Sequence, residues 1–282
     1  MESARQAPRF ESHRARGARL VVDAGWIGAA EARALLLPGE LARRLADASG
    51  ARGRAATALW LARDGSRALL RPVRHGGLLA PLWGERLLGL GRPLRELRVA
   101  AELHARGAPV PRPLLVVAVR RGAFWHAALA TAYEEGARDG VALLAAEPAR
   151  ARLVRALDAA ARAVRRFHDA GGHHADLHLG NLLFREGESA CEALVIDLDG
   201  AHAGAPPGAA RRMRELMRLY RSLAKRGLAA QIGARGCARF LSAYCDGDRA
   251  LRRALLASLP RERLRLARHA ASWRIAGALS AR

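Results

Sequence analysis

The sequence predicts an α+β protein with two lobes: a small antiparallel β-sheet lobe that carries one helix, and a larger, mainly helical lobe. Three observations lead to this prediction. Short apolar strand patterns separated by tight turns lie in the first half of the chain, and long amphipathic helical patterns dominate the second half. Between a helix and two short strands lies the polar loop 174–181. We expect the boundary after Glu135, giving lobes of residues 1–135 and 136–282.

Composition limits the class of protein. The chain has 282 residues, of which 51% are hydrophobic, enough for a substantial core. No apolar run approaches the roughly 20 residues that a membrane span needs, and residues 1–5 lead into no apolar stretch, so we expect no secretory signal. The cysteines, Cys191, Cys237 and Cys245, are odd in number and lack metal-binding spacing, which favours free thiols in a reducing cytoplasm.

The formal charge of +22 has two explanations, and the sequence leaves both open. One is a polyanionic partner: nucleic acid, an anionic membrane face or a phosphorylated lipid. The other is the Arg/Ala/Gly-rich composition that a GC-rich genome produces. Nucleic-acid binding gains no support from the pattern, because no aromatic residues are interleaved with the basic runs as a stacking surface requires. Lys225 is the only lysine and does not follow a glycine-rich loop, which excludes a P-loop.

In the first half, residues 1 to about 20 are polar and Arg-rich and are expected to be loose, and 31–48 is expected to form a short helix. The small residues of 50–57, with Gly50, Gly53 and Arg54, lead into a strand, where backbone N–H groups could approach phosphate oxygens. The following pattern predicts strands at 58–61, 66–71, 114–119 and 123–133, and a helix at 93–107. Glu96 on that helix could pair with Arg71 on a strand, although the sequence alone favours a solvent-facing glutamate.

In the second half, a strong apolar stripe predicts a helix at 148–170, ending before two glycines. Two short strands are expected at 182–184 and 193–196. Residues 211–226 predict a basic amphipathic helix whose apolar face is Met213, Leu216, Met217, Tyr220 and Leu223, and further helices are expected at 236–244 and 249–259. That face is expected to belong to the core, with a membrane-surface role as the alternative.

The polar loop carries the chemistry. It reads H-x-D-L-x-x-x-N from His174 to Asn181, and Asp197 follows at the end of an apolar run. Such a set suits phosphoryl transfer: the carboxylate of Asp176 would orient a hydroxyl and accept its proton, while Asn181 and Asp197 would hold Mg²⁺. Two alternatives are ordinary turn-forming residues and a metal hydrolase built on the cluster of His173, His174, Asp176 and His178. The histidine order of the zinc hydrolases is absent.

The loop resembles the catalytic and metal loops of the protein-kinase-like superfamily, and further segments narrow the resemblance. In order along the chain they are Gly53-Arg54, 71–78 (R-x-x-R-x-G-G-L), 92–97 (R-x-x-R-E), 107–113 (G-x-P-V-P-x-P), 174–181 and 196–199. Together these segments resemble the lipopolysaccharide kinase family over residues 50 to 226, most closely its members that act on the sugar 3-deoxy-D-manno-octulosonic acid (Kdo). The sequence departs from that pattern at Pro72, Val73, His75, Leu198 and 200–211.

The resemblance implies a protein-kinase-like bilobal fold and an ATP- and Mg²⁺-dependent phosphotransferase with an alcohol acceptor. Asp176 would be catalytic, Asn181 and Asp197 would bind the metal, and Arg71, set by Glu96, would contact the nucleotide phosphates under the turn containing Gly50, Gly53 and Arg54. The acceptor would be a hydroxyl of Kdo on the lipid A precursor, at the cytoplasmic face of the inner membrane, whose anionic surface would be a partner. No nucleic-acid partner is expected. The alternatives are another small-molecule or protein kinase of the same fold, or a non-enzymatic basic nucleic-acid-binding protein.

Overall fold

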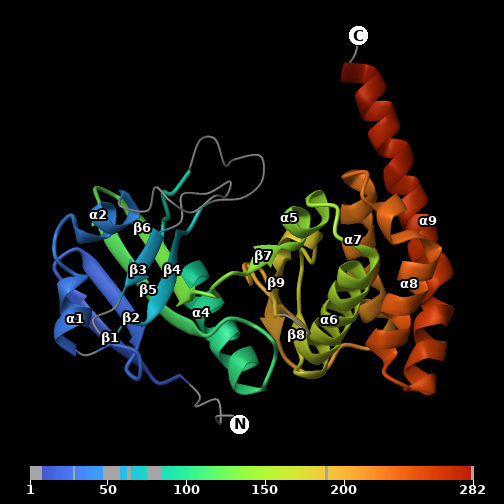
Figure 1. The fold of residues 1–282 in the computed structure, drawn as a ribbon. Helices are drawn as coiled ribbons and strands as arrows, with labels where there is room; N and C mark the ends of the chain where they lie inside the picture. Colours follow the sequence, from blue (N-terminus) through green and yellow to red (C-terminus); the bar gives the residue numbers. More distant parts are fainter. Residues whose placement is uncertain are drawn as a thin grey trace. The chain divides into compact units, whose positions relative to one another are not determined.

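The computed structural model describes residues 8–27, 29–46, 58–61, 65–74, 84–187 and 190–280. The chain divides into two compact units, Met1–Glu135 and Gly136–Arg282. The first contains an antiparallel β-sheet with a few helices, and the second contains the long helices and two small sheets (Figure 1). The predicted α+β fold is therefore confirmed.

The first unit is built on one six-stranded sheet in the order β1-β2-β5-β6-β4-β3, in which every neighbouring pair is antiparallel. The four strands predicted within 58–133 are confirmed. The expectation of a loose segment to about residue 20 is wrong for residues 10–20, where β1 and β2 form a hairpin, and residues 1–7 lie outside the described residues. Leu20 and Val22 alternate into the core, and the polar side chains of β1 suit an exposed edge. The strands are β1 (Phe10–Ala15), β2 (Ala18–Asp23), β3 (Ala58–Leu61), β4 (Arg67–Pro72), β5 (Pro113–Arg121) and β6 (Phe124–Ala132).

Both faces of this sheet are covered. Alternate residues of β5 point to opposite faces, so Leu115 and Val117 join one buried cluster and Val116 joins the other. The first cluster includes residues of α1 (Ala29–Ala34) and α2 (Glu40–Ala46), and the second includes Leu97 of α4 (Gly91–Ala105). The single helix expected at 31–48 is thus two short helices, since Pro38 and Gly39, with φ +81°, interrupt the pattern.

The second unit consists of helices around two small sheets. β7, β9 and β10 form one sheet, and β8 pairs with β11. Two helix predictions need correction. α8 begins earlier than residue 236 and is kinked at Gly233, whose positive φ is non-helical (φ 60°, ψ −178°), and α9 continues through Pro260 well past residue 259. The elements are β7 (Arg138–Asp139), α5 (Gly140–Ala145), α6 (Arg150–Asp169), β8 (Gly172–His173), η1 (Leu179–Asn181, a 3₁₀ turn), β9 (Leu182–Glu186), β10 (Cys191–Val195), β11 (His202–Ala203), α7 (Ala209–Lys225), α8 (Ala229–Cys245) and α9 (Arg249–Ser280).

Small residues let α6 lie deep in this unit. Ala160, Ala161, Ala163 and Val164 are all buried, and Phe167 fills the space at the end of the helix. α6 packs against α8 and β10, while α7 packs against α9. Over the described residues, no helix is both long enough and apolar enough to cross a membrane.

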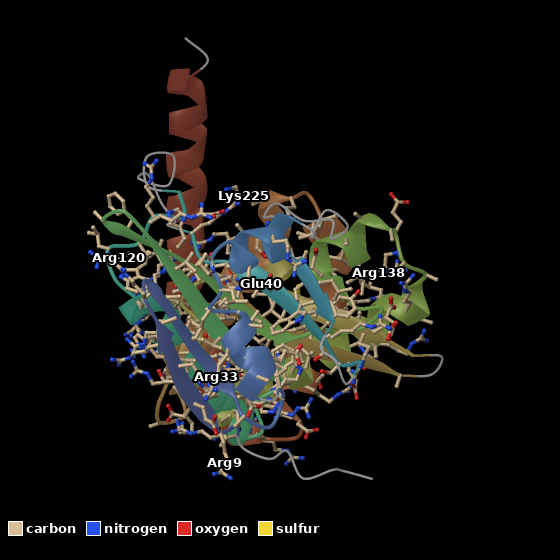
Figure 2. The ribbon with its side chains drawn as sticks, turned by 90° about the vertical axis from the view of Figure 1, so that its left-hand side faces the viewer. Arg9, Arg33, Glu40, Arg120, Arg138 and Lys225 are labelled. Carbon is tan, nitrogen blue, oxygen red and sulfur yellow. The ribbon has the colours of Figure 1, made fainter. Side chains whose placement is uncertain are left out.

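Arginines dominate the exposed surface of both units. Figure 2 shows the guanidinium ends of Arg9, Arg33, Arg120 and Arg138 on the outside of the protein, and all four residues are exposed. A folded chain with a net charge of +22 gains solubility from this arrangement but loses some stability to self-repulsion.

A buried carboxylate ties the end of β2 to the proline-rich segment before β5. Asp23 is 1% exposed and accepts hydrogen bonds from the backbone N–H groups of Arg9 (3.1 Å) and Gly25 (3.2 Å). The Nε atom of Arg112 donates to the other carboxylate oxygen at 3.0 Å. Because the Arg112 side chain is 37% exposed, the structural value of this cluster lies mainly in satisfying the buried aspartate.

We expect Asp23→Ala to lower the free energy of unfolding by about 2 to 3 kcal/mol, since two backbone donors and a guanidinium lose their acceptor. Chemical denaturation of the two proteins measures the difference. Arg120→Ala is the control, because Arg120 is exposed and, among the described residues, its side chain donates only to the nearby carbonyl oxygen of Gly122; it should change stability by less than about 0.5 kcal/mol. Equal effects of the two substitutions would contradict the assignment.

Candidate active site

The polar loop is delivered by the end of α6. Gly171 adopts φ +84°, a left-handed conformation that lets the chain reverse after the helix. A Cβ atom on Gly172 would lie 2.7 Å from the carbonyl oxygen of Phe167 and from its ring, so this position also requires glycine. The β8–β11 pairing, with His173 opposite His202, then holds the segment that enters the loop against the segment that leaves Asp197.

His174 joins the two halves of the site. Its ring is buried, its Nδ1 atom accepts the backbone N–H of Asp176 at 3.2 Å, and its Nε2 atom donates to the carbonyl oxygen of Ile196 at 3.2 Å. These bonds require the neutral tautomer with the proton on Nε2. Burial lowers the pKa of His174, and the nearby charges of Asp197 and Asp176 only partly offset that effect. Since the ring bonds to the backbone of Asp176 and to that of Ile196, the residue before Asp197, His174 acts as a brace between the two loops.

Asn181 and Asp197 are linked by a second set of contacts. The backbone N–H of Ile196 donates a hydrogen bond to the carbonyl oxygen of Asn181 at 2.9 Å. Asn181 is buried, and its side-chain amide donates a hydrogen bond from Nδ2 to the carbonyl oxygen of Asp176 at 3.0 Å. Asp197 itself has φ +59°, a left-handed conformation that aspartate tolerates better than most residues. The structure thus brings together the three residues that the sequence assigns to catalysis and metal binding. The carboxylate of Asp176 remains 74% exposed.

The donor set fits magnesium. The hydrogen bond of Asn181 Nδ2 fixes the amide so that Oδ1 is the atom available to a cation, and Asp197 adds a carboxylate. Mg²⁺ is characteristically held by one or two such oxygen ligands, with waters and substrate phosphates completing its coordination. In the part of the chain that the structure describes, no three His, Cys, Asp or Glu side chains gather as a metal group.

Helix α7 holds the backbone of the catalytic loop through three polar side chains on one face. An oxygen of Glu215 accepts the N–H of His174 at 3.1 Å, Arg218 donates to the carbonyl oxygen of the same residue at 3.1 Å, and Ser222 Oγ accepts the N–H of Leu179 at 2.9 Å. Their spacing of three and four residues places them on one stripe. The loop is therefore fixed at both ends by a single rigid helix.

A buried chain of hydrogen bonds extends from Glu215. Tyr244 OH donates to His168 Nδ1 at 2.6 Å, and His168 Nε2 donates to Glu215 at 3.1 Å. Arg212 donates to the tyrosine oxygen at 3.3 Å and to Asp169 at 2.7 Å. Burial lowers the pKa of His168, in keeping with a neutral ring. Burial alone would raise the pKa of Glu215, but the hydrogen bonds that it accepts from the His168 ring and from the backbone N–H of His174 lower it.

In the first unit, the predicted partners Arg71 and Glu96 form an ion pair. Glu96 is buried, with 4% of its side chain exposed, so it is not the solvent-facing residue that the sequence alone favours. Gly50, Gly53 and Arg54, the other predicted cofactor-binding residues, lie outside the described residues, as do His75 and the glycine pair after it.

Sequence reasoning missed the polar face of α7. The predicted apolar face is right for Met213, Leu216 and Leu223, which are buried. In the sequence, Glu215 is a single acid in a basic helix, so its contact with the loop was not predicted. The signal that could have identified this contact is that Glu215 and Ser222 lie on one stripe of an otherwise basic segment. Buried polar residues at helical spacing beside a catalytic loop indicate contacts to backbone.

A comparison with solved structures identifies the fold class of this protein. A solved chain of WaaP, from a structure of WaaP in complex with acyl carrier protein, superposes with a TM-score of 0.51 at 20% identity, covering 94% of this chain and 90% of that chain. The protein therefore has the protein-kinase-like fold.

The sequence comparison narrows this class to a family. The model of the lipopolysaccharide kinase (Kdo/WaaP) family matches residues 50–244, and the chain belongs to this family. It is similar to 3-deoxy-D-manno-octulosonic acid kinases of Xylella fastidiosa strain M12 (34% identity over 162 residues, 56% of this chain and 62% of the relative) and Xanthomonas campestris pv. campestris strain B100 (36% over 162 residues, 56% and 61%). The chain thus matches about three fifths of the length of these relatives.

We expect Gly172→Ala to destabilise the second unit by about 1 to 3 kcal/mol, the usual cost of overpacking, because the new methyl group meets a backbone oxygen that cannot move aside. Thermal unfolding measures the change. Gly204→Ala, where a Cβ atom meets nothing within 4 Å, is the control on the neighbouring segment and should be nearly neutral. An unperturbed Gly172→Ala protein would show that the close approach is unimportant.

The buried histidines predict acid sensitivity. The folded-state pKa values of His168 and His174 are lowered, so the unfolded chain binds protons first as the pH falls. Their contribution to stability is complete above about pH 6.5, the unfolded-state value, and is lost as the pH falls toward the folded-state values. Urea unfolding between pH 7.5 and 5.5 should show this loss. His168→Gln and His174→Asn should each be less stable at pH 7.5 yet lose less on acidification; an unchanged slope in both variants would refute the assignment.

Proposed function

We propose that this protein is an ATP-dependent kinase that phosphorylates a hydroxyl of the Kdo sugar on the lipid A precursor. Three lines of support converge: the chain belongs to the lipopolysaccharide kinase family, its relatives named above are Kdo kinases, and the catalytic loop has the required chemistry. The observation that supports the proposal most is a set of hydrogen bonds in the polar loop: buried His174 bonds to the backbone of Asp176 and of Ile196, which precedes Asp197, and Asn181 bonds to the backbone of Asp176.

In the proposed reaction, Asp176 orients the acceptor hydroxyl and takes its proton as that oxygen bonds to the terminal phosphorus of ATP; the bond to the bridging oxygen breaks, and ADP leaves. Asn181 and Asp197 would hold Mg²⁺, and the ion would supply positive charge to neutralise the phosphate oxygens. The exposure of the Asp176 carboxylate suits contact with an external acceptor, while its backbone is held by His174 and Asn181. Holding the general base in place is worth far more than its basicity alone.

Arg71 is proposed to contact the nucleotide phosphates. A guanidinium can bind phosphate oxygens bidentately, so arginine is chemically suited to the place where kinase-like folds usually carry lysine. Its ion pair with the buried Glu96 fixes the direction of the side chain. Gly50, Gly53 and Arg54 are proposed to cover the phosphates, because glycines permit close approach of backbone N–H groups.

The acceptor suggests where the protein works. A kinase for a glycolipid precursor would act as a peripheral protein on the cytoplasmic face of the inner membrane, and the net charge of +22 would favour an anionic surface. This arrangement needs no membrane span.

The test is transfer of labelled γ-phosphate from ATP to Kdo-bearing lipid A precursor. Asp176→Asn should lower kcat by about 10²- to 10⁴-fold, the usual contribution of a general base, without abolishing nucleotide binding. For the metal ligand, Asp197→Asn is a cleaner variant than Asp197→Ala, because asparagine also tolerates the left-handed backbone at this position. It should raise the Mg²⁺ concentration needed for half-maximal activity.

Asp246→Asn is the matched control. Asp246 is exposed and also left-handed, with φ 46°, so the same change of charge is made without touching the site. It should keep full activity. Transfer to a protein or to another sugar, with none to the glycolipid, would replace the proposed acceptor and keep a kinase. Tight, salt-sensitive binding of DNA or RNA without ATP turnover would replace the kinase altogether.

A further inference from the structure

Helix α7 carries a row of positive charge beside the catalytic loop. Arg211, Arg214, Arg218, Arg221 and Lys225 follow one another at intervals of three or four residues, which places them on one stripe of the helix. We call this set the α7 basic stripe. Arg211, Arg214 and Lys225 are exposed, and Arg218 and Arg221 are half-buried. Figure 2 labels Lys225, the last member, whose amine end lies on the outside of the protein.

The stripe runs along the segment that leads to Asp176. Arg218 donates to the carbonyl oxygen of His174, two residues before the aspartate, at 3.1 Å. About two turns earlier on the helix, Arg211 donates to Nε2 of His173 at 3.4 Å. Neither contact involves a carboxylate, so the positive charges sit beside the proposed general base without being neutralised by these partners.

Most of the stripe lacks acidic partners. Among the residues that the structure describes, no carboxylate pairs with Arg211, Arg218 or Arg221. Arg214 approaches Glu262 of α9 at 3.7 Å, but that glutamate also pairs with Arg265 at 2.6 Å. By contrast, arginines elsewhere in this unit do find acids, as Arg239 does with Asp158 at 2.6 Å. Three guanidinium groups at helical spacing without carboxylate partners, those of Arg211, Arg218 and Arg221, can bind phosphate oxygens.

We propose that the α7 basic stripe binds the phosphate groups of the acceptor glycolipid and so determines that the substrate is a phosphorylated one. This inference rests on the proposed function, since the acceptor is the molecule that must reach Asp176. Phosphate groups at the stripe would hold a separate hydroxyl of the same molecule at the loop. The same chemistry occurs in lipid headgroups, and the test must separate the two sources.

The probe is Kdo-bearing lipid A precursor in neutral detergent micelles, with and without prior removal of its phosphates by a phosphatase. Direct binding, followed by calorimetry, is measured for wild type and for the double variant Arg221→Gln/Lys225→Gln, which alters no side chain shown to touch the loop. The double variant should bind the phosphorylated acceptor about tenfold or more weakly, the range expected for lost charged hydrogen bonds. It should bind the dephosphorylated acceptor as wild type does.

The matched control is Arg162→Gln/Arg253→Gln, which removes the same charge from exposed positions on α6 and α9. It should leave acceptor binding unchanged. Lys225→Gln alone should give a smaller loss of the same kind. Thermal unfolding of each variant checks that the fold is intact.

Several results would overturn the proposal. If the stripe and control variants weaken acceptor binding equally, the effect is general electrostatic attraction and the proposal is wrong. If the wild type binds phosphorylated and dephosphorylated acceptor with equal affinity, the proposal is also wrong. An effect absent in neutral micelles and present only on phosphatidylglycerol vesicles would assign the stripe to the membrane instead. The experiment measures binding and not phosphate transfer. If the protein binds the phosphorylated acceptor through the stripe but transfers no phosphate, the proposed function is refuted and this inference still holds.

Discussion

The catalytic loop depends on one buried carboxylate. Glu215 accepts hydrogen bonds from the backbone of His174 and from the ring of His168, so it connects α7, the loop and the end of α6 at a single point. A buried charge is stable only when its oxygens are occupied, which makes the position of each partner depend on the others. Because Glu215 fixes the backbone of His174, the His174 ring can hold the backbone N–H of Asp176. The same ring bonds to the carbonyl oxygen of Ile196 and so joins the loop to the segment that ends in Asp197.

Local sequence patterns predicted much of the loop and of the elements around it. The loop between α6 and β9, the paired strands β9 and β10, and the three residues Asp176, Asn181 and Asp197 follow from hydrophobic periodicity and from the chemistry of oxygen ligands. Glycines after α6 were expected for their conformational freedom, which Gly171 uses; the need for glycine at Gly172 comes instead from Phe167, a contact that no local rule contains.

The parts that escaped prediction are those that depend on tertiary contacts. The segment of β1 was expected to be loose from its polar, basic sequence, and it forms a strand because β2 pairs with it. The helix expected at 31–48 is divided because a proline and a left-handed glycine outweigh its apolar spacing. Glu96 and Glu215 illustrate the same limit. Each is an acid among arginines in the sequence, and each is buried because one or two distant groups satisfy it. Burial of a charge is decided by its partner, which periodicity does not reveal.

The pairing of Arg71 with Glu96 has a practical consequence for chemical labelling. A guanidinium stays protonated at any pH a protein tolerates and is a poor nucleophile, whereas an ammonium at the same position would lose its proton and react with acylating reagents. Lys225, the sole lysine, lies on α7 in the other unit. An amine-directed acylating reagent therefore finds no lysine side chain to modify anywhere in residues 1–135, the unit that carries Arg71 and Glu96.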